Sequence, residues 1–228
     1  MQNKGIAICV MCKPPRVGIS KTRLAAEIGA QNAASLAAAF LLDVAAVVLE
    51  AVATNSAQPY AFFTPPDARD EIRGLMPEPW TLLAVREADV GATMHSAICT
   101  LLQDGHSGVI IIGADLPTVP LSIITQAIQM LVALEADAII GPSEDGGYYL
   151  IGLKAPCSAL FGEMPWSTPD VFGITVERAQ AAGLSLKRLP VWHDVDDAAS
   201  LARLREELAS TPPDCAAHTR RALAGISA

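Results

Sequence analysis

The chain has 228 residues, 51% of them hydrophobic, and a formal net charge of -8 at pH 7. This length and composition suit a globular protein of one large α/β domain or two small ones, and they exclude extensive disorder. The acidic balance argues against general nucleic-acid binding, because that function needs a broad basic face.

Short apolar runs alternate with longer helical patterns along almost the whole chain. The predicted strands are Gly5–Met11, Tyr60–Thr64, Thr81–Val85, Gly108–Ile112, Ala138–Gly141 and Tyr148–Leu153. The predicted helices are Ala30–Ala53, Asp67–Leu75, Thr93–Gln103, Leu121–Leu134, Asp170–Ala182 and Ala198–Leu208. The alternation predicts βαβ units, and therefore a Rossmann-like α/β fold of three αβα layers with a mostly parallel, mixed central sheet.

No linker, repeat or low-complexity segment interrupts the chain. We therefore expect a single domain over residues 1–211 and a loosely attached short helix in the tail at 212–228. Asp43 and Glu50 interrupt the apolar run from Ala33 to Ala53, whose apolar residues recur with helical period, so a core helix is predicted rather than a membrane span. Scattered cysteines without a secretory signal before the first strand predict free thiols in a cytoplasmic protein.

The first predicted strand runs into a basic loop, whose cations are Lys13, Arg16, Lys21 and Arg23. The loop is not a Walker P-loop, because Ser20 stands where that motif has the glycine before its lysine. Pro15 stiffens the loop and Gly18 lets its backbone turn, which suits an anion such as a phosphate. Thr22 could cap a following helix and add amide donors. A solvated surface loop is the alternative, but the position directly after a strand favours the anion site.

Three acidic segments follow later apolar runs, and ligands of open α/β sheets bind beyond the carboxyl ends of the strands. Asp115 follows the fourth predicted strand and could hold Mg²⁺ or Mn²⁺ together with substrate phosphates; its alternative role is a helix cap or turn. Asp194 and Asp196 would point to the same side of an extended segment, and Asp196 is the preferred second metal ligand. The alternative is a helix-start cluster, with Asp197 as the cap of the last predicted helix.

The segment Glu144-Asp145-Gly146-Gly147 lies between two predicted strands, and Asp-Gly is a strong hairpin signal. Asp145 could project from that turn as a base or hydroxyl acceptor, while Gly146 and Gly147 let a ligand approach the backbone. The structural and functional roles are compatible. Further along, Trp166-Ser167-Thr168-Pro169 is typical of a helix start with Thr168 as the N-cap, and Trp166 could form a wall of an acceptor pocket.

Several motifs occur together in the order and spacing of one known family. They are Lys13-x-Pro15-x-x-Gly18-x-x-Lys21-Thr22-Arg23-Leu24, Gly113-x-Asp115-x-Pro117, Gly141-Pro-x-x-Asp145-Gly-Gly-Tyr148-Tyr-Leu-Ile-Gly152-Leu, Trp166-Ser167-Thr168 and Asp194-Val-Asp196. From about Gly5 to Leu201 the chain resembles the DUF2064 family, a bacterial group named as glycosyltransferases associated with radical-SAM/selenodomain proteins. That family belongs to the GT-A, nucleotide-diphospho-sugar transferase superfamily, which also holds the molybdenum-cofactor and coenzyme F420 nucleotidyltransferases.

The resemblance implies a role for each motif. The donor nucleotide and its phosphates would contact Lys13, Pro15, Gly18, Lys21, Thr22, Arg23, Gly91 and Asp115. The acceptor would contact Asp145, Gly146, Gly147, Trp166, Ser167 and Thr168. Asp115 and Asp196 would hold Mg²⁺ or Mn²⁺. Thr93 stands where members of the family usually carry an Arg, which removes a cation near the donor site.

The resemblance also implies a metal-dependent transferase with a nucleotide or nucleotide-sugar donor and a small-molecule acceptor. In a glycosyltransferase, which the family name favours, Asp145 would activate the acceptor hydroxyl while Lys21 and Arg23 stabilise the departing nucleoside diphosphate. In a nucleotidyltransferase, which the cation-rich loop favours, the acceptor would attack the α-phosphate of an NTP and expel pyrophosphate. A non-catalytic nucleotide-binding regulatory protein is the third alternative. The oligomeric state stays open.

Overall fold

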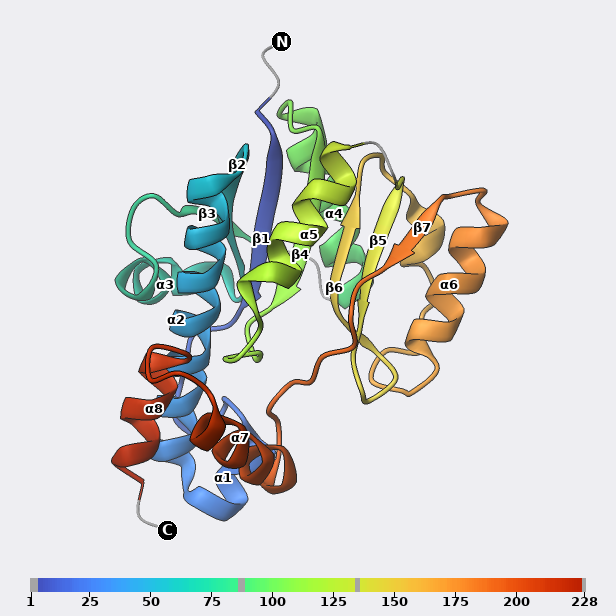
Figure 1. Ribbon diagram of the computed structural model, residues 1–228. Coiled ribbons are helices and arrows are strands. Elements are labelled where there is room, and N and C mark those ends of the chain that lie inside the picture. Colours follow the sequence, from blue (N-terminus) through green and yellow to red (C-terminus); the bar gives the residue numbers. More distant parts are fainter. Residues whose placement is uncertain (1–3, 86–88, 134–135, 227–228) are drawn as a thin grey trace.

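A computed structural model describes residues 4–85, 89–133 and 136–226 of the chain (Figure 1). At its centre is a seven-stranded sheet with the strand order β3-β2-β1-β4-β6-β5-β7. The strands are β1 (Ile6–Cys12), β2 (Ala57–Phe63), β3 (Thr81–Ala84), β4 (Gly108–Gly113), β5 (Ala138–Pro142), β6 (Tyr148–Leu153) and β7 (Leu186–Arg188). Strand β6 is antiparallel to both of its neighbours, and the other neighbouring pairs are parallel. The predicted mostly parallel, mixed sheet is confirmed.

Helices cover both faces of this sheet (Figure 1). They are α1 (Thr22–Ile28), α2 (Ala30–Thr54), α3 (Arg69–Leu75), α4 (Val90–Gln103), α5 (Leu121–Val132), α6 (Val171–Ala181), α7 (Ala198–Ser210) and α8 (Ala217–Ala224), with short 3₁₀ turns at Pro66–Ala68 and Ser158–Leu160. Side chains of α2, α3 and α5 join the core on one face, and those of α4 and α6 join the core on the other. The three-layer αβα arrangement follows from strands such as β1, which is apolar toward both faces.

A third apolar cluster joins α1, the first half of α2, α7 and α8 beside the sheet (Figure 1). Helix α8 lies in the tail, and the expectation that this helix is loosely attached is wrong. Its N-cap, Ala216, has no side-chain acceptor, and the buried carboxylate of Asp43 on α2 accepts instead from the backbone N–H groups of His218 and Thr219, at 2.9 and 2.8 Å. A carboxylate at a helix N-terminus satisfies free donors and offsets the helix dipole, so α8 is anchored to α2.

Two elements are missing from the sequence-based predictions because both are short. Helix α1 spans seven residues, and β7 spans three residues with an exposed Lys187 and Arg188. Helix α4 begins three residues earlier than predicted, because Asp89 caps it by accepting from the Ala92 N–H at 2.8 Å. The helix predicted over Leu121–Leu134 corresponds to α5, and its predicted end, Leu134, lies outside the described residues.

Helix α2 is long and apolar enough to cross a membrane by length and composition alone. Half of its most apolar stretch is nevertheless buried within the protein, as in a core helix. Its buried side chains include Phe40, Val44 and Val48, which pack into the cores described above. Helix α2 therefore has the packing that its sequence pattern predicts.

Candidate active site

The basic loop and the acidic segments meet beyond the carboxyl ends of the strands, at one edge of the sheet. The loop follows β1, Asp115 follows β4, and Asp145 follows β5. The extended segment that holds Asp194 and Asp196 is fixed beside Asp115, because the Val195 N–H donates to the Asp115 carbonyl at 3.1 Å. Residues that are far apart in the sequence thus form one site.

Hydrogen bonds within the basic loop direct Lys21 into the protein. The Arg16 N–H donates to Ser20 Oγ at 2.9 Å, and Lys21 adopts a left-handed backbone with φ 49°. Helix α1 begins directly after Lys21, so Lys21 occupies the N-cap position and the prediction of Thr22 as the cap is wrong. The Lys21 side chain is only 6% exposed. Its backbone turn therefore places a buried ammonium in the site.

Lys21 bridges two carboxylates that the sequence places on different loops. Its Nζ atom lies 2.9 Å from Asp115 Oδ1 and 2.5 Å from Asp196 Oδ1. Arg23 adds a more exposed contact, with Nη2 at 3.2 Å from Asp196 Oδ2. Burial acts to raise the pKa of Asp196, but the contacts with Lys21, the hydrogen bond with Asp194 and the charge of Arg23 together hold the pKa below its ordinary value. Asp196 is therefore ionised and paired.

The other two cations of the loop behave differently. Arg16 is held away from the carboxylates by Glu71 on α3, with Nη2 2.5 Å and Nε 3.1 Å from the two carboxylate oxygens. Lys13 is exposed and makes no ion pair within the part of the chain that the structure describes. Lys13 is thus the loop cation most available to a ligand.

Two cavities adjoin at this edge. The larger, of about 760 Å³, is lined by Lys13, Arg16, Lys21, Thr22 and Arg23 of the basic loop, by Thr93 of α4, and by Asp89, Asp115 and Asp196. The smaller, of about 300 Å³, is lined by Asp115, Asp145, Asp194, Trp166, Ser167 and Thr168 together with Gly147 and residues of β4 and β6. Asp115, Met11 and Val90 line both cavities. Pro15 and Gly18 line neither, and they shape the loop only.

The turn between β5 and β6 has the predicted form. Gly146 has φ +88°, and the Gly147 N–H donates to Asp145 Oδ1 at 2.9 Å. A Cβ atom on Gly146 would lie 2.5 Å from Pro169 Cα, so this glycine allows the turn to pack against the start of α6. The structural role of the Asp-Gly pair holds, and Asp145 also lines the smaller cavity.

The segment before α6 differs from the prediction. Thr168 does not cap a helix: its hydroxyl donates to the Pro165 carbonyl at 2.8 Å, and α6 begins at Val171 after Asp170. Trp166 reaches the smaller cavity because Gly91 on α4 leaves room for it; a Cβ there would lie 2.8 Å from the Trp166 ring. Gly91 therefore makes room for Trp166 in the wall of the smaller cavity, and it lines neither cavity itself.

The three acidic residues of the late segment, Asp194, Asp196 and Asp197, have different roles. Asp197 caps α7 in a capping box with Ser200, as the helix-start alternative predicts. Asp194 lines the smaller cavity, while Asp196 lines the larger. Burial, and then the neighbouring carboxylates of Asp196 and Asp145, raise the pKa of Asp194 to about 6.

Several lining residues were not singled out from the sequence. Met11 and Val90 lie at the junction of the cavities, and Ser143 and Tyr148 flank the turn that carries Asp145. Tyr148 is the first residue of β6 and directly follows the two glycines of that turn. Its position in the Asp145-Gly-Gly-Tyr148 motif could therefore have marked it as a site residue. Met11 and Val90 carry no such signal, because apolar residues at strand and helix ends are common.

A mixed sheet with one reversed strand, and a site at its carboxyl edge, define the GT-A-like fold of nucleotide-diphospho-sugar transferases and cytidylyltransferases. Residues 47–168, more than half of the chain, match the family described as "Uncharacterized protein conserved in bacteria (DUF2064)". The chain belongs to the DUF2064 family, as its motifs predict. The matched range includes Asp115, Asp145 and Trp166, and it excludes the basic loop and Asp196.

Solved structures share this fold over almost the whole chain. A candidate nucleotide-diphospho-sugar transferase from Desulfovibrio desulfuricans G20 is 29% identical with a TM-score of 0.86, covering 98% of this chain and 96% of that one. CMP:2-keto-3-deoxy-manno-octonic acid synthetase complexed with CTP is 11% identical with a TM-score of 0.57, covering 90% and 98%. A 4-diphosphocytidyl-2C-methyl-D-erythritol synthase from Anaerococcus prevotii DSM 20548 is 10% identical with a TM-score of 0.58, covering 90% and 99%. No curated protein matches the chain in sequence.

Proposed function

We propose that the protein is a metal-dependent transferase that moves a glycosyl group from a nucleotide-diphospho-sugar to a hydroxyl of a small acceptor. The observation that carries this proposal is the position of Asp115 at the junction of two cavities, of which only the larger is lined by cations. The larger cavity contains the cations of the basic loop, and the smaller one is lined by carboxylates, hydroxyls and aromatic rings. A donor diphosphate suits the first cavity and an acceptor suits the second.

The larger cavity provides the groups that a diphosphate needs. Its volume of about 760 Å³ is in the range of pockets for small ligands and cofactors. Lys13 is available to a phosphate, and Lys21 and Arg23 are already gathered beside Asp115 and Asp196. Cations fixed before the reaction stabilise charge that develops on the leaving group, which is the main electrostatic contribution expected of such a site.

Asp115 and Asp196 fit a divalent cation in one respect: each directs an oxygen at one common cationic position, held by Lys21 Nζ at 2.9 and 2.5 Å. Among the described side chains, no three or more His, Cys, Asp or Glu are grouped to hold a metal. Oxygen atoms of the substrate would therefore complete the coordination, as is usual for Mg²⁺. Bound Mg²⁺ or Mn²⁺ would neutralise charge on the donor diphosphate.

In the proposed step, the acceptor hydroxyl oxygen bonds to the anomeric carbon of the sugar. The bond from that carbon to the diphosphate oxygen breaks, and the nucleoside diphosphate leaves with the electron pair. The hydroxyl proton passes to the carboxylate of Asp145, which projects from the β5–β6 turn into the smaller cavity. Lys21 and Arg23 hold the departing diphosphate.

Nucleotidyl transfer is the second candidate, and the density of cations in the basic loop favours it. In that reaction an acceptor oxygen bonds to the α-phosphorus of an NTP, and the bond to the pyrophosphate oxygen breaks. Pyrophosphate carries more charge than a nucleoside diphosphate, so it would gain more from Lys13, Lys21 and Arg23. Positioning and charge neutralisation would then provide most of the catalysis, and Asp145 would not be needed as a base.

One incubation separates these candidates. The protein is mixed with Mg²⁺ or Mn²⁺, a panel of NTPs and nucleotide-diphospho-sugars, and a panel of small alcohols as acceptors. Release of a nucleoside diphosphate from a sugar donor is the expected result. Release of pyrophosphate from an NTP would instead support nucleotidyl transfer. Tight nucleotide binding without either product would support the non-catalytic alternative.

A further inference from the structure

We propose that the smaller cavity selects an acceptor that carries an organic ammonium group beside an apolar or aromatic portion, and that Asp145 is the residue that recognises this cation. The inference rests on the proposed function, because it takes the smaller cavity as the acceptor side. It goes further in naming the chemical class of the acceptor, and the residue that selects it. Asp145 can hold the ammonium and also take the hydroxyl proton where these two groups are neighbours in the acceptor, because its carboxylate has two oxygens.

The charges of the smaller cavity are all of one sign. Three carboxylates line it, those of Asp115, Asp145 and Asp194, and none of its lining residues is a Lys, Arg or His. Asp115 pairs with Lys21, which lines the neighbouring cavity and also contacts Asp196. Asp145 makes no ion pair within the described ranges, although its Oδ1 accepts from the Gly147 N–H. Asp145 therefore keeps oxygen acceptors for a ligand.

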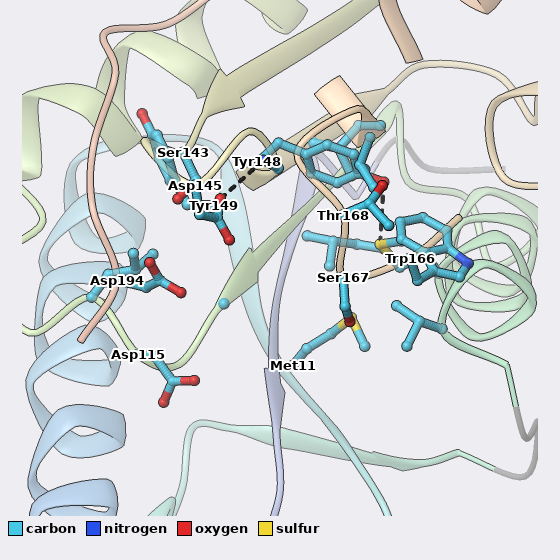
Figure 2. Close-up of a pocket in the computed structure, with 18 residues that line it drawn as sticks. Met11, Asp115, Ser143, Asp145, Tyr148, Tyr149, Trp166, Ser167, Thr168 and Asp194 are labelled. Atoms are coloured by element: carbon cyan, nitrogen blue, oxygen red, sulfur yellow. Dashed lines mark hydrogen bonds between the residues drawn. The ribbon is translucent and has the colours of Figure 1, made fainter. Parts of the chain in front are cut away.

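The opposite wall is aromatic and bears hydroxyl groups. Figure 2 shows Asp115, Asp145 and Asp194 on one side of the cavity, and Trp166, Ser167 and Thr168 on the other. Trp166 and Tyr148 meet edge to face, with ring centroids 6.3 Å apart. Indole and phenol rings attract both apolar groups and organic cations. A ligand with a planar or aliphatic portion would contact this wall while its charge faces the carboxylates.

Tyr148 does not change this balance of charge. Burial raises the pKa of Tyr148 well above its ordinary value, so the phenol is neutral, and its hydroxyl is directed at Met94 Sδ, at 3.9 Å.

Like charges a few ångströms apart repel each other, so a phosphorylated or carboxylate-bearing acceptor would be rejected. The volume of about 300 Å³ suits a molecule of one ring or a short chain.

The test uses a matched set of small alcohols that differ in one charged group. The probes are 2-amino-1-phenylethanol, 1-phenyl-1,2-ethanediol and mandelate, which carry a positive, a neutral and a negative group next to the same benzylic hydroxyl. Their dissociation constants are measured by ligand-observed NMR with EDTA present and no donor. We expect the cationic probe to bind at least about tenfold more tightly than the neutral one, as one charge-assisted hydrogen bond supports. The anionic probe should bind most weakly.

The matched variants are Asp145→Asn and Glu144→Gln. Asn keeps an oxygen that can accept from the Gly147 N–H, so the turn should be retained while the charge is lost. Glu144 is the adjacent carboxylate, but it pairs with Arg203 and lines neither cavity. We expect Asp145→Asn to bring the cationic and neutral probes within about threefold, and Glu144→Gln to keep the wild-type ratio. Circular dichroism checks that both variants are folded.

Equal or tighter binding of the neutral or anionic probe would overturn the proposal, as would an undiminished ratio in Asp145→Asn or no binding of any probe. These titrations can fail independently of the test of the proposed function, because they contain no donor and measure acceptor binding alone. A protein that prefers the cationic probe but releases nothing from any nucleotide would contradict the transferase and support the cation site. A protein that transfers the glycosyl group to neutral alcohols, and shows no preference for the cationic probe, would support the transferase and contradict the cation site.

Discussion

The ammonium nitrogen of Lys21 lies 2.5 Å from a carboxylate oxygen of Asp196, although the two residues are 175 positions apart in the chain. The same nitrogen lies 2.9 Å from Asp115, so one buried cation connects the loop after β1 with the loop after β4 and the segment before α7. The two halves of the site are therefore held together before any ligand binds. A donor phosphate would compete with these carboxylates for Lys21.

Replacing Lys21 by Met should weaken nucleotide binding by about 10- to 100-fold, the effect of one lost hydrogen bond to a charged group. Met keeps most of the length of the side chain and removes the charge. Lys4→Met is the matched control, because Lys4 pairs with Asp104 away from either cavity. Isothermal titration with a nucleoside diphosphate and Mn²⁺ measures the change. Equal affinities for both variants would remove Lys21 from the donor site.

Asp115→Asn and Asp196→Asn should each abolish the Mn²⁺-dependent part of nucleotide binding, because each removes one of the two carboxylates proposed to hold the metal. The measurement is calorimetry with and without Mn²⁺. Asp104→Asn, on the exposed Lys4 pair, is the control and should behave as the wild type. If both site variants kept their Mn²⁺ dependence, the assignment of the metal ligands would be wrong.

Asp145→Asn should lower turnover by about 10²- to 10⁴-fold if this carboxylate takes the acceptor proton. Donor affinity should stay within about twofold, since Asp145 does not line the larger cavity. Steady-state kinetics at saturating donor separates the two quantities. A normal rate in this variant would exclude Asp145 as the base and would favour the nucleotidyl reaction, which needs none.

Gly146→Ala should destabilise the protein more than Gly183→Ala. Both glycines have positive φ, +88° and +69°, so each substitution carries a backbone penalty of about 1–2 kcal/mol. Only at Gly146 would the new Cβ also meet the Pro169 backbone, which adds about 1–3 kcal/mol of overpacking. Urea unfolding of the two variants measures the difference. Equal losses would mean that the β5–β6 turn can move away from α6.

His106 should make the free energy of unfolding fall as the pH is lowered. The ring is buried, with Nε2 2.8 Å from the Tyr60 hydroxyl and Nδ1 3.2 Å from the Gly5 carbonyl, and burial lowers the pKa of His106 below its ordinary value of 6.5. The unfolded chain therefore binds a proton more readily than the folded one. The contribution is present above pH 6.5 and is lost as the pH falls through that value toward the folded pKa.

The measurement is urea unfolding between pH 7.5 and 5, for the wild type and for His106→Gln. The variant should lose less stability over this range, because its side chain does not titrate. Parallel losses in the two proteins would show that His106 binds protons equally well in both states.

The sequence by itself determined every strand except β7, most helices and the layering of the fold. Runs such as Val109–Ile112 in β4 are apolar toward both faces, and this requires cover on both sides of a sheet. The order of the elements then placed the basic loop and Asp115 at one edge, since carboxyl ends of parallel strands share an edge. The Asp-Gly turn and the capping role of Asp197 also follow from local chemistry, because each involves residues within three positions of one another.

Only the tertiary structure decided which of these groups touch. The contacts from Lys21 to Asp196, from Asp43 to the start of α8, and from Gly91 to Trp166 each join residues that are distant in the chain. No local pattern encodes such pairs, because they depend on how the helices and loops pack around the finished sheet. The same packing placed Asp194 against the smaller cavity and Asp196 against the larger, with their carboxyl groups still in contact, and left Asp145 as an acid without a cationic partner in the described residues. The division of the site into a cavity with paired cations and carboxylates and a cavity with carboxylates alone is therefore a property of the fold.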